Sequence, residues 1–107
     1  MAYLDELIAR TKILIGRWHG HNASMRELTG SHPTLSVVVL GKYREMNLVI
    51  YCISPEYICG PVKWPDSAIQ IIPVQLVGGT IGVALVDERS GVRVTAEAFE
   101  VKENVRL

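Results

Sequence analysis

The feature that most constrains the fold is a pair of turns that agree on one buried face. Gly78-Gly79 is typical of a two-residue hairpin loop, and Arg89-Ser90 marks the centre of the next turn. Shifting either hairpin by one residue would bring Gln75, Arg93 and Glu97 into an otherwise apolar face. The two turns therefore predict a three-stranded antiparallel meander, because side chains alternate between the faces of a strand. Its buried face is predicted to consist of Ile72, Val74, Leu76, Ile81, Val83, Leu85, Val94, Ala96 and Ala98.

The opposite face of this meander is predicted to be flat and partly apolar. Gly82 and Ala84 stand in mid-strand, where small side chains permit close approach of a second surface. The runs at 35–40 and 48–53 are apolar on both of their faces, and one helix cannot cover both faces. We therefore expect a homo-oligomer, most simply a twofold dimer, with closure of the sheet into a barrel as the alternative. The candidate contact residues are Val38, Leu40, Ile71, Gly82, Ala84 and Val86.

The N-terminal segment predicts an amphipathic helix that ends near residues 16–18. Its apolar residues recur at steps of three and four. Together with Thr11 they form one stripe, which is Leu4, Leu7, Ile8, Thr11, Leu14, Ile15 and Trp18. A second, short helix is predicted after it, because Ser24 and Glu27 form a capping box and Gly30 can end the helix.

The rest of the chain predicts strands, because runs rich in Val and Ile alternate with turn residues. After Ala98 the apolar positions shift to Phe99 and Val101, which predicts a bulge or a change of layer. The strands are expected at 35–42, 47–53, 69–77, 80–86 and 92–101, with a sixth, short one at 57–62.

The composition bounds the class of protein. The chain has 107 residues, and 49% of them are hydrophobic, which excludes disorder. Eleven basic residues balance eleven acidic ones, so no positive field favours nucleic acid or anionic lipid. Asp5, Glu6 and Arg10 interrupt the apolar N-terminus, so we expect no signal peptide, no membrane span and a cytoplasmic protein.

Histidines and cysteines are the candidate metal ligands. His19 and His21 form a His-x-His pair that could join His32 at one metal, although a polar end of the helix explains the pair equally well. If 54–57 is a turn, Cys52 faces Cys59 across two strands. The alternative is that both cysteines are small buried residues. We expect no metal, no disulfide and no cofactor.

The segment from Gly60 to Ser67 is the candidate recognition surface. Trp64 stands between two prolines, next to Lys63 and close to Asp66. A tryptophan held in a stiff segment offers a large contact area at a low entropic cost. Together with Trp18 these residues are the candidate binding residues, although Trp64 could instead cap the core.

These observations predict one α+β domain over residues 1–107. An N-terminal amphipathic helix would pack on a strongly curved antiparallel sheet of five or six strands, or on a partly closed barrel. The sequence lacks nucleophile-elbow, zincin, P-loop and dinucleotide-binding motifs, and no catalytic residues are predicted. The function favoured is a homo-oligomeric binding module whose ligand or partner lies between helix and sheet or near Trp64. The alternative is a small enzyme or metal protein that uses the histidines or the cysteine pair.

Overall fold

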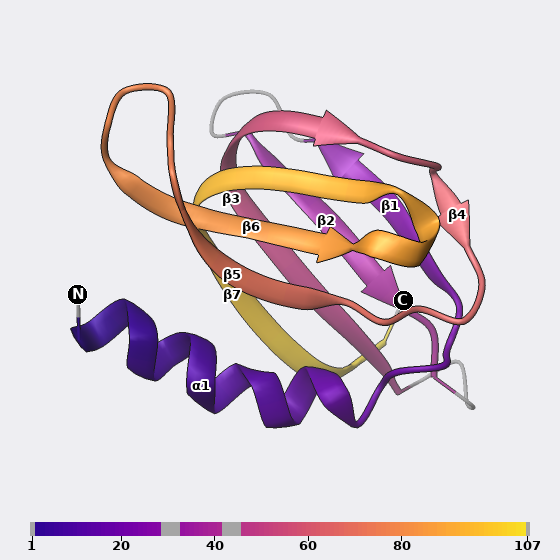
Figure 1. The fold of residues 1–107 in the computed structure, drawn as a ribbon. Helices are drawn as coiled ribbons and strands as arrows, with labels where there is room; N and C mark the ends of the chain where they lie inside the picture. The colour runs from indigo at the N-terminus through magenta and orange to yellow at the C-terminus, as the bar shows by residue number, and fades with distance from the viewer. Residues whose placement is uncertain (1, 29–32, 42–45, 107) are drawn as a thin grey trace.

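The protein has an α+β fold with one N-terminal helix and a seven-stranded antiparallel sheet (Figure 1). The structure is a computed structural model that describes residues 2–28, 33–41 and 46–106. The elements are α1 (Ala2–Gly16), β1 (Ala23–Leu28), β2 (Thr34–Val39), β3 (Asn47–Cys59), β4 (Lys63–Trp64), β5 (Gln70–Gln75), β6 (Ile81–Asp87), the short 3₁₀ turn η1 (Glu88–Ser90) and β7 (Val92–Val105). The strand order is β4-β1-β2-β3-β7-β6-β5, so the sheet is open and not a barrel.

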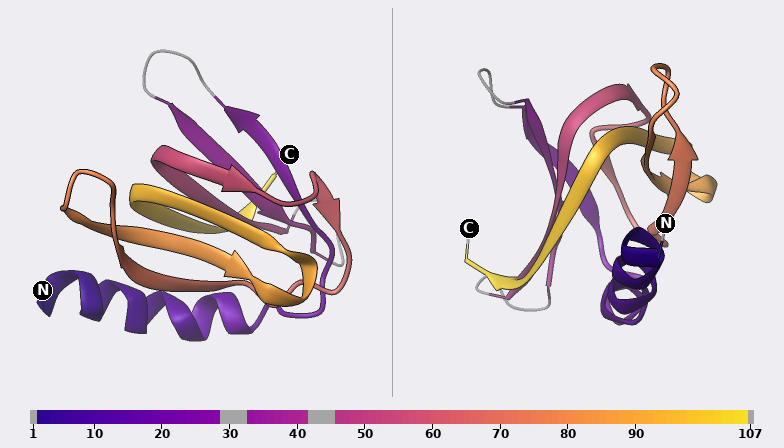
Figure 2. Two further views of the ribbon diagram at one scale, coloured as in Figure 1. Left: turned by 45° about the horizontal axis from the view of Figure 1, so that its top comes forward. Right: turned by 90° about the vertical axis from the view of Figure 1, so that its left-hand side faces the viewer.

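The long strands β3 and β7 give the sheet its curvature. Figure 2 shows how both arch over, so that β5 and β6 lie in a different layer from β1 and β2. The β3–β7 ladder is irregular between Asn47 and Val49 and again between Pro55 and Tyr57. Burial along β7 changes phase after Ala96, in agreement with the predicted change of layer.

The helix packs against the concave side of this curved sheet. Its predicted apolar stripe and its end at Gly16 are confirmed. Ile15 is buried, whereas the other members of the stripe are only partly buried. The core that they join is built mainly from β2, β3, β6 and β7, with Val37, Ile50, Leu85 and Val94 nearly inaccessible.

The second hairpin has the predicted register, and the first does not. Leu85 pairs with Val94 and Val83 with Ala96, as expected. On the other side of β6, Leu85 pairs with Ile71 instead of Ile72. The predicted buried positions Ile72 and Val74 were therefore wrong. Ile81 and Ala98, at the ends of the predicted buried face, are exposed as well.

The reason for the shift is the length of the β5–β6 loop. The Gly79 N–H donates to the Leu76 carbonyl (2.9 Å), and the Leu76 N–H donates to the Thr80 carbonyl (2.8 Å). These bonds close a loop of three residues, with Gly79 at a φ of 88° that favours glycine. Ile71 consequently joins the core, while Ile72 is 37% exposed on the outer face.

Two further predictions were wrong. Residues 23–28 form the strand β1 and no helix, because Ala23 pairs with Val39 on one side and with Trp64 on the other. Pairing on two sides outweighs a capping box, which contributes only about 1 kcal/mol. Gly30 lies outside the described residues. The expected turn at 54–57 and the sixth strand after it are both replaced by β3, which runs on to Cys59 with a kink at Ser54 (φ 52°).

Candidate functional site

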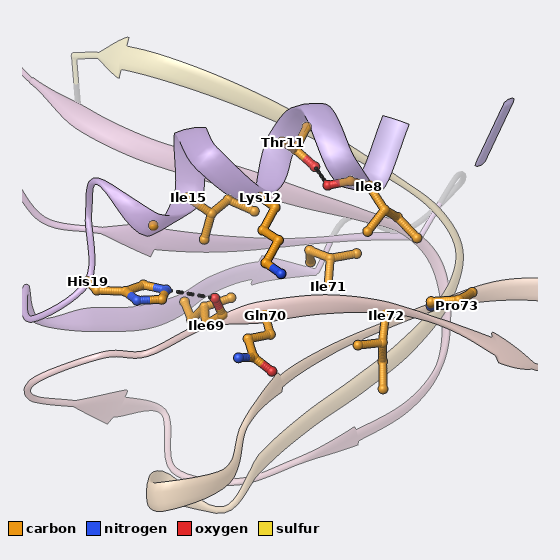
Figure 3. A pocket seen from close by; sticks show the side chains of 11 residues that line it. Ile8, Thr11, Lys12, Ile15, His19, Ile69, Gln70, Ile71, Ile72 and Pro73 are labelled. Carbon is orange, nitrogen blue, oxygen red and sulfur yellow. Dashed lines mark hydrogen bonds between the residues drawn. The ribbon is translucent and has the colours of Figure 1, made fainter. Parts of the chain in front are cut away.

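A cleft lies between α1 and β5 (Figure 3). Its volume is about 380 Å³, within the range of about 300–1,000 Å³ that is typical of ligand sites. Most of the lining is aliphatic. The lining residues are Ile8, Thr11, Lys12, Ile15, Gly16, His19, Ile69, Gln70, Ile71, Ile72 and Pro73.

Helical spacing positions one wall of this cleft. Ile8, Lys12 and Ile15 follow one another at steps of four and three residues, so they project from one side of α1, and His19 lies in the turn that follows the helix. Gly16, the last residue of the helix, also lines the cleft, and an added Cβ there would meet no atom within 4 Å. The opposite wall is the strand β5 with the residue that precedes it.

The polar groups of the cleft are few. The Lys12 side chain reaches from α1 toward β5, and Gln70 lies below it (Figure 3). His19 Nε2 lies 3.0 Å from the Ile69 carbonyl oxygen, and because a carbonyl only accepts, this nitrogen carries the proton. The cleft therefore combines an aliphatic body with one ammonium group, which suits a ligand with an acidic end.

Trp64 is a buried residue with a buried acidic partner. It is 3% exposed, and its indole N–H donates to Asp87 Oδ2 (2.9 Å). The same oxygen accepts a bond from the Ala68 N–H (2.8 Å), whereas Asp87 Oδ1 has no partner among the described residues. One edge of Trp64 borders a second cavity of about 320 Å³, next to Lys63. A ligand near Trp64 thus remains the alternative to the helix–sheet cleft.

The four predicted binding residues do not converge on one place. Asp66 forms an ion pair with Arg89 (3.4 Å) on the surface. Trp18 is half-buried and donates from Nε1 to Glu103 Oε1 (3.1 Å), which ties the end of α1 to β7. Only Trp64 and its neighbour on β4 share a cavity.

The two described histidines form hydrogen bonds with different backbone carbonyl groups. His19 contacts Ile69, as above, and His21 Nδ1 lies 2.9 Å from the Leu40 carbonyl oxygen. His32 lies outside the described residues. Within 2–28, 33–41 and 46–106, no three His, Cys, Asp or Glu side chains are grouped so as to hold a metal ion.

The two cysteines belong to one strand, so they form no cross-strand pair, and of the two only Cys52 is a buried residue. Cys52 pairs with Phe99 and Cys59 with Arg93, both along β3. Burial raises the pKa of the Cys52 thiol to about 12. Cys59 is exposed, and its hydrogen bond with Tyr57 is the main cause of a raised pKa of that phenol.

The residues expected at an oligomer contact have little free surface in the single chain. Four of them, Val38, Ile71, Ala84 and Val86, are buried. Gly82 is also buried and Leu40 is half-buried. Any partner must therefore contact their larger neighbours, among which Ile72 and Tyr57 are exposed.

The site residues that sequence reasoning missed are Lys12 and the edge of β5. Lys12 is not one of the apolar residues of the helix, yet it stands at helical spacing from Ile8 and Ile15. Its position next to these two members of the apolar stripe was the available signal.

None of three comparisons, with protein-family models, with curated proteins and with solved structures, gives a match to this chain. No helix in the described part of the chain is long and apolar enough to cross a membrane. Function is therefore argued from the geometry of the site.

Proposed function

We propose that the protein is a non-catalytic, homo-oligomeric binding module whose ligand occupies the α1–β5 cleft. The ligand has an aliphatic body and an acidic end that lies beside Lys12. The observation that carries this proposal is a cleft of about 380 Å³ with aliphatic walls from two elements and a lysine that reaches across it.

The walls supply affinity, and the polar end supplies orientation. Ile8 and Ile15 from α1 face Ile71 from β5, so an apolar ligand would be covered on both sides. Each methylene that leaves water contributes about 0.8 kcal/mol. The Lys12 ammonium contributes less at this exposed position, but it distinguishes an acid from an alcohol of the same shape.

Two separate glycines, Gly16 and Gly78, allow a direct test of the cleft. Gly16→Leu would fill the cleft, and because its Cβ meets no atom within 4 Å we expect the fold to survive. Gly78→Leu is the matched control, since it has the same open space in the remote β5–β6 loop. The probe is anilinonaphthalene sulfonate, an apolar anion whose fluorescence rises on burial.

We expect the wild type and Gly78→Leu to bind the probe and to release it to decanoate, with decanol less effective. Gly16→Leu should lose most of the fluorescence, and Lys12→Gln should bind more weakly than the surface control Lys102→Gln. Equal binding by both glycine variants, with thermal unfolding unchanged, would contradict the proposal.

The homo-oligomer is supported by the outer face of the sheet. A row of paired residues, Ile72, Ala84, Thr95 and Tyr57, crosses β5, β6, β7 and β3. Arg93 and Glu97 lie on either side of Thr95 on the same face, because they are two residues away along β7. A twofold axis that runs along this row would place each Arg93 opposite the Glu97 of the second copy, so the surface is self-complementary.

Charge reversal tests this arrangement. Arg93→Glu and Glu97→Arg should each weaken the dimer, and the double variant should restore it, because reversed charges again face each other. The measurement is sedimentation equilibrium. A wild-type species of 11.9 kDa at every concentration, or a dimer whose mass neither single variant changes, would refute this surface.

A further inference from the structure

We infer that the ligand of the α1–β5 cleft is an extended, acidic peptide segment that adds to the free edge of β5. This inference rests on the proposed function, because it assumes that the cleft is the binding site. It goes further by naming the class of ligand and the backbone groups that would bind it.

The first observation is the position of β5 at the end of the sheet. β5 pairs with β6 on one side, and among the described strands it has no partner on the other. An unpaired strand edge is a template for a further strand. The helix α1 runs beside this edge in Figures 1 and 2, and the cleft separates the two.

The second observation is which backbone groups of β5 face the cleft. In an antiparallel pair, alternate residues exchange both hydrogen bonds with the partner strand, and the residues between them point away. Because the Leu76 N–H donates to the Thr80 carbonyl, the backbone N–H and carbonyl groups of the even-numbered residues of β5 point toward β6. The odd-numbered residues, Ile71 and Pro73, therefore direct their backbone groups toward the cleft.

Pro73 agrees with this assignment independently. Proline has no N–H to give to a ladder, so it is tolerated in a strand where that position faces outward. The open edge thus offers the N–H and carbonyl of Ile71 and the carbonyl of Pro73. His19 already bonds to the carbonyl of Ile69, two residues before Ile71, from the α1 side of the cleft. Groups that approach from the helix can therefore reach this edge.

The side chains of the cleft define the sequence that fits. The lining part of β5, together with the residue before the strand, runs from Ile69 to Pro73, so a segment of about five residues would match it at about 3.3 Å per residue. Side chains that alternate along this segment would contact Ile8 and Ile15 on one side. An acidic side chain on the segment would lie within reach of Lys12, whose side chain points into the cleft.

The experiment uses the full chain and one blocked peptide, acetyl-Thr-Val-Glu-Val-Thr-amide. Two derivatives carry two N-methyl groups each, at the second and fourth residues or at the third and fifth. They match in mass and apolarity, but they block opposite edges of the peptide strand. Binding is followed by the NMR shifts of the backbone amides, and a Lys analogue of the Glu peptide tests the charge.

We expect the parent peptide to shift the Ile71 amide more than the Ile72 amide. One N-methyl isomer should lose about tenfold in affinity and the other should retain it, because only one of them loses the bonds to the carbonyls of Ile71 and Pro73. The Lys analogue should bind more weakly than the Glu peptide, and Lys12→Gln should remove that difference.

Equal affinities for the two N-methyl isomers, or no binding of any peptide, would overturn this inference. If the sulfonate probe and decanoate still bind in that case, the proposed function stands with a non-peptide ligand. If the probe does not bind either, both proposals fail.

Discussion

The register of β5 can be tested with two adjacent isoleucines. Ile71 is 8% exposed in the core, whereas Ile72 is 37% exposed on the outer face. Replacement by alanine removes three carbon atoms from each side chain, about 2.4 kcal/mol of transfer free energy for a fully buried group. Nearly all of this applies at Ile71, and the cavity left behind raises the cost of Ile71→Ala to about 3 kcal/mol. Ile72→Ala leaves no closed cavity and should cost about 1 kcal/mol.

The assay is urea unfolding followed by tryptophan fluorescence. The two variants share one strand, one side-chain type and nearly the same β-propensity, so their difference reports burial. We expect Ile71→Ala to lower the free energy of unfolding by about 2 kcal/mol more than Ile72→Ala does. A larger loss of unfolding free energy for Ile72→Ala would support the register of the two-residue loop and refute the assignment of Ile71 to the core.

Three further predictions follow from single contacts. In the folded chain a disulfide reagent should label the exposed Cys59 at about pH 8 but not the buried Cys52. The pKa of the Cys52 thiol is about 12, so at this pH only about one molecule in 10⁴ carries the Cys52 thiolate. Labelling of both cysteines before denaturant is added would contradict the burial of Cys52. Gly82→Ala should cost about 1–3 kcal/mol in thermal unfolding, because the new Cβ would lie 2.7 Å from Leu76 Cδ1 and closer still to a backbone carbonyl of β7; a neutral effect would contradict this packing. Asp87→Asn should be nearly neutral, since it keeps an oxygen for both N–H donors, whereas Asp87→Ala should cost at least about 2 kcal/mol; equal losses in both variants would refute the role of that oxygen.

Much of the fold could be predicted because its signals are local and repeated. The helix needed only the spacing of its apolar residues, and the β6–β7 hairpin needed only its turn and the alternation on two strands. β1 could not be found in this way. Ser24 and Glu27 satisfy a local rule for a helix start, but the pairing of β1 with both β2 and β4 decides the structure, and β4 is far away in sequence.

The burial of Trp64 could not be decided from the sequence for a related reason. A tryptophan between prolines has the same sequence signature whether its ring faces solvent or the core. The deciding partner is Asp87, which lies 23 residues away and accepts the indole N–H. A buried carboxylate of this kind cannot be recognised from one sequence, because aspartate at the end of a strand is ordinarily a surface residue.

The register of β5, in contrast, could have been predicted from the sequence. A two-residue loop at Gly78-Gly79 would pair Val77 with Thr80 through hydrogen bonds, and every second residue back along the strand would then face β6. Pro73 would be one of those residues, and it has no N–H to give. The three-residue loop moves Pro73 to the outward position and Ile71 into the core with its neighbours Leu85 and Val94. The apolar pattern alone did not separate the two registers, because Ile71 and Ile72 are both aliphatic. The same proline therefore fixes the buried face of β5 and turns the backbone groups of Ile71 toward α1, so the core and the cleft have one common cause.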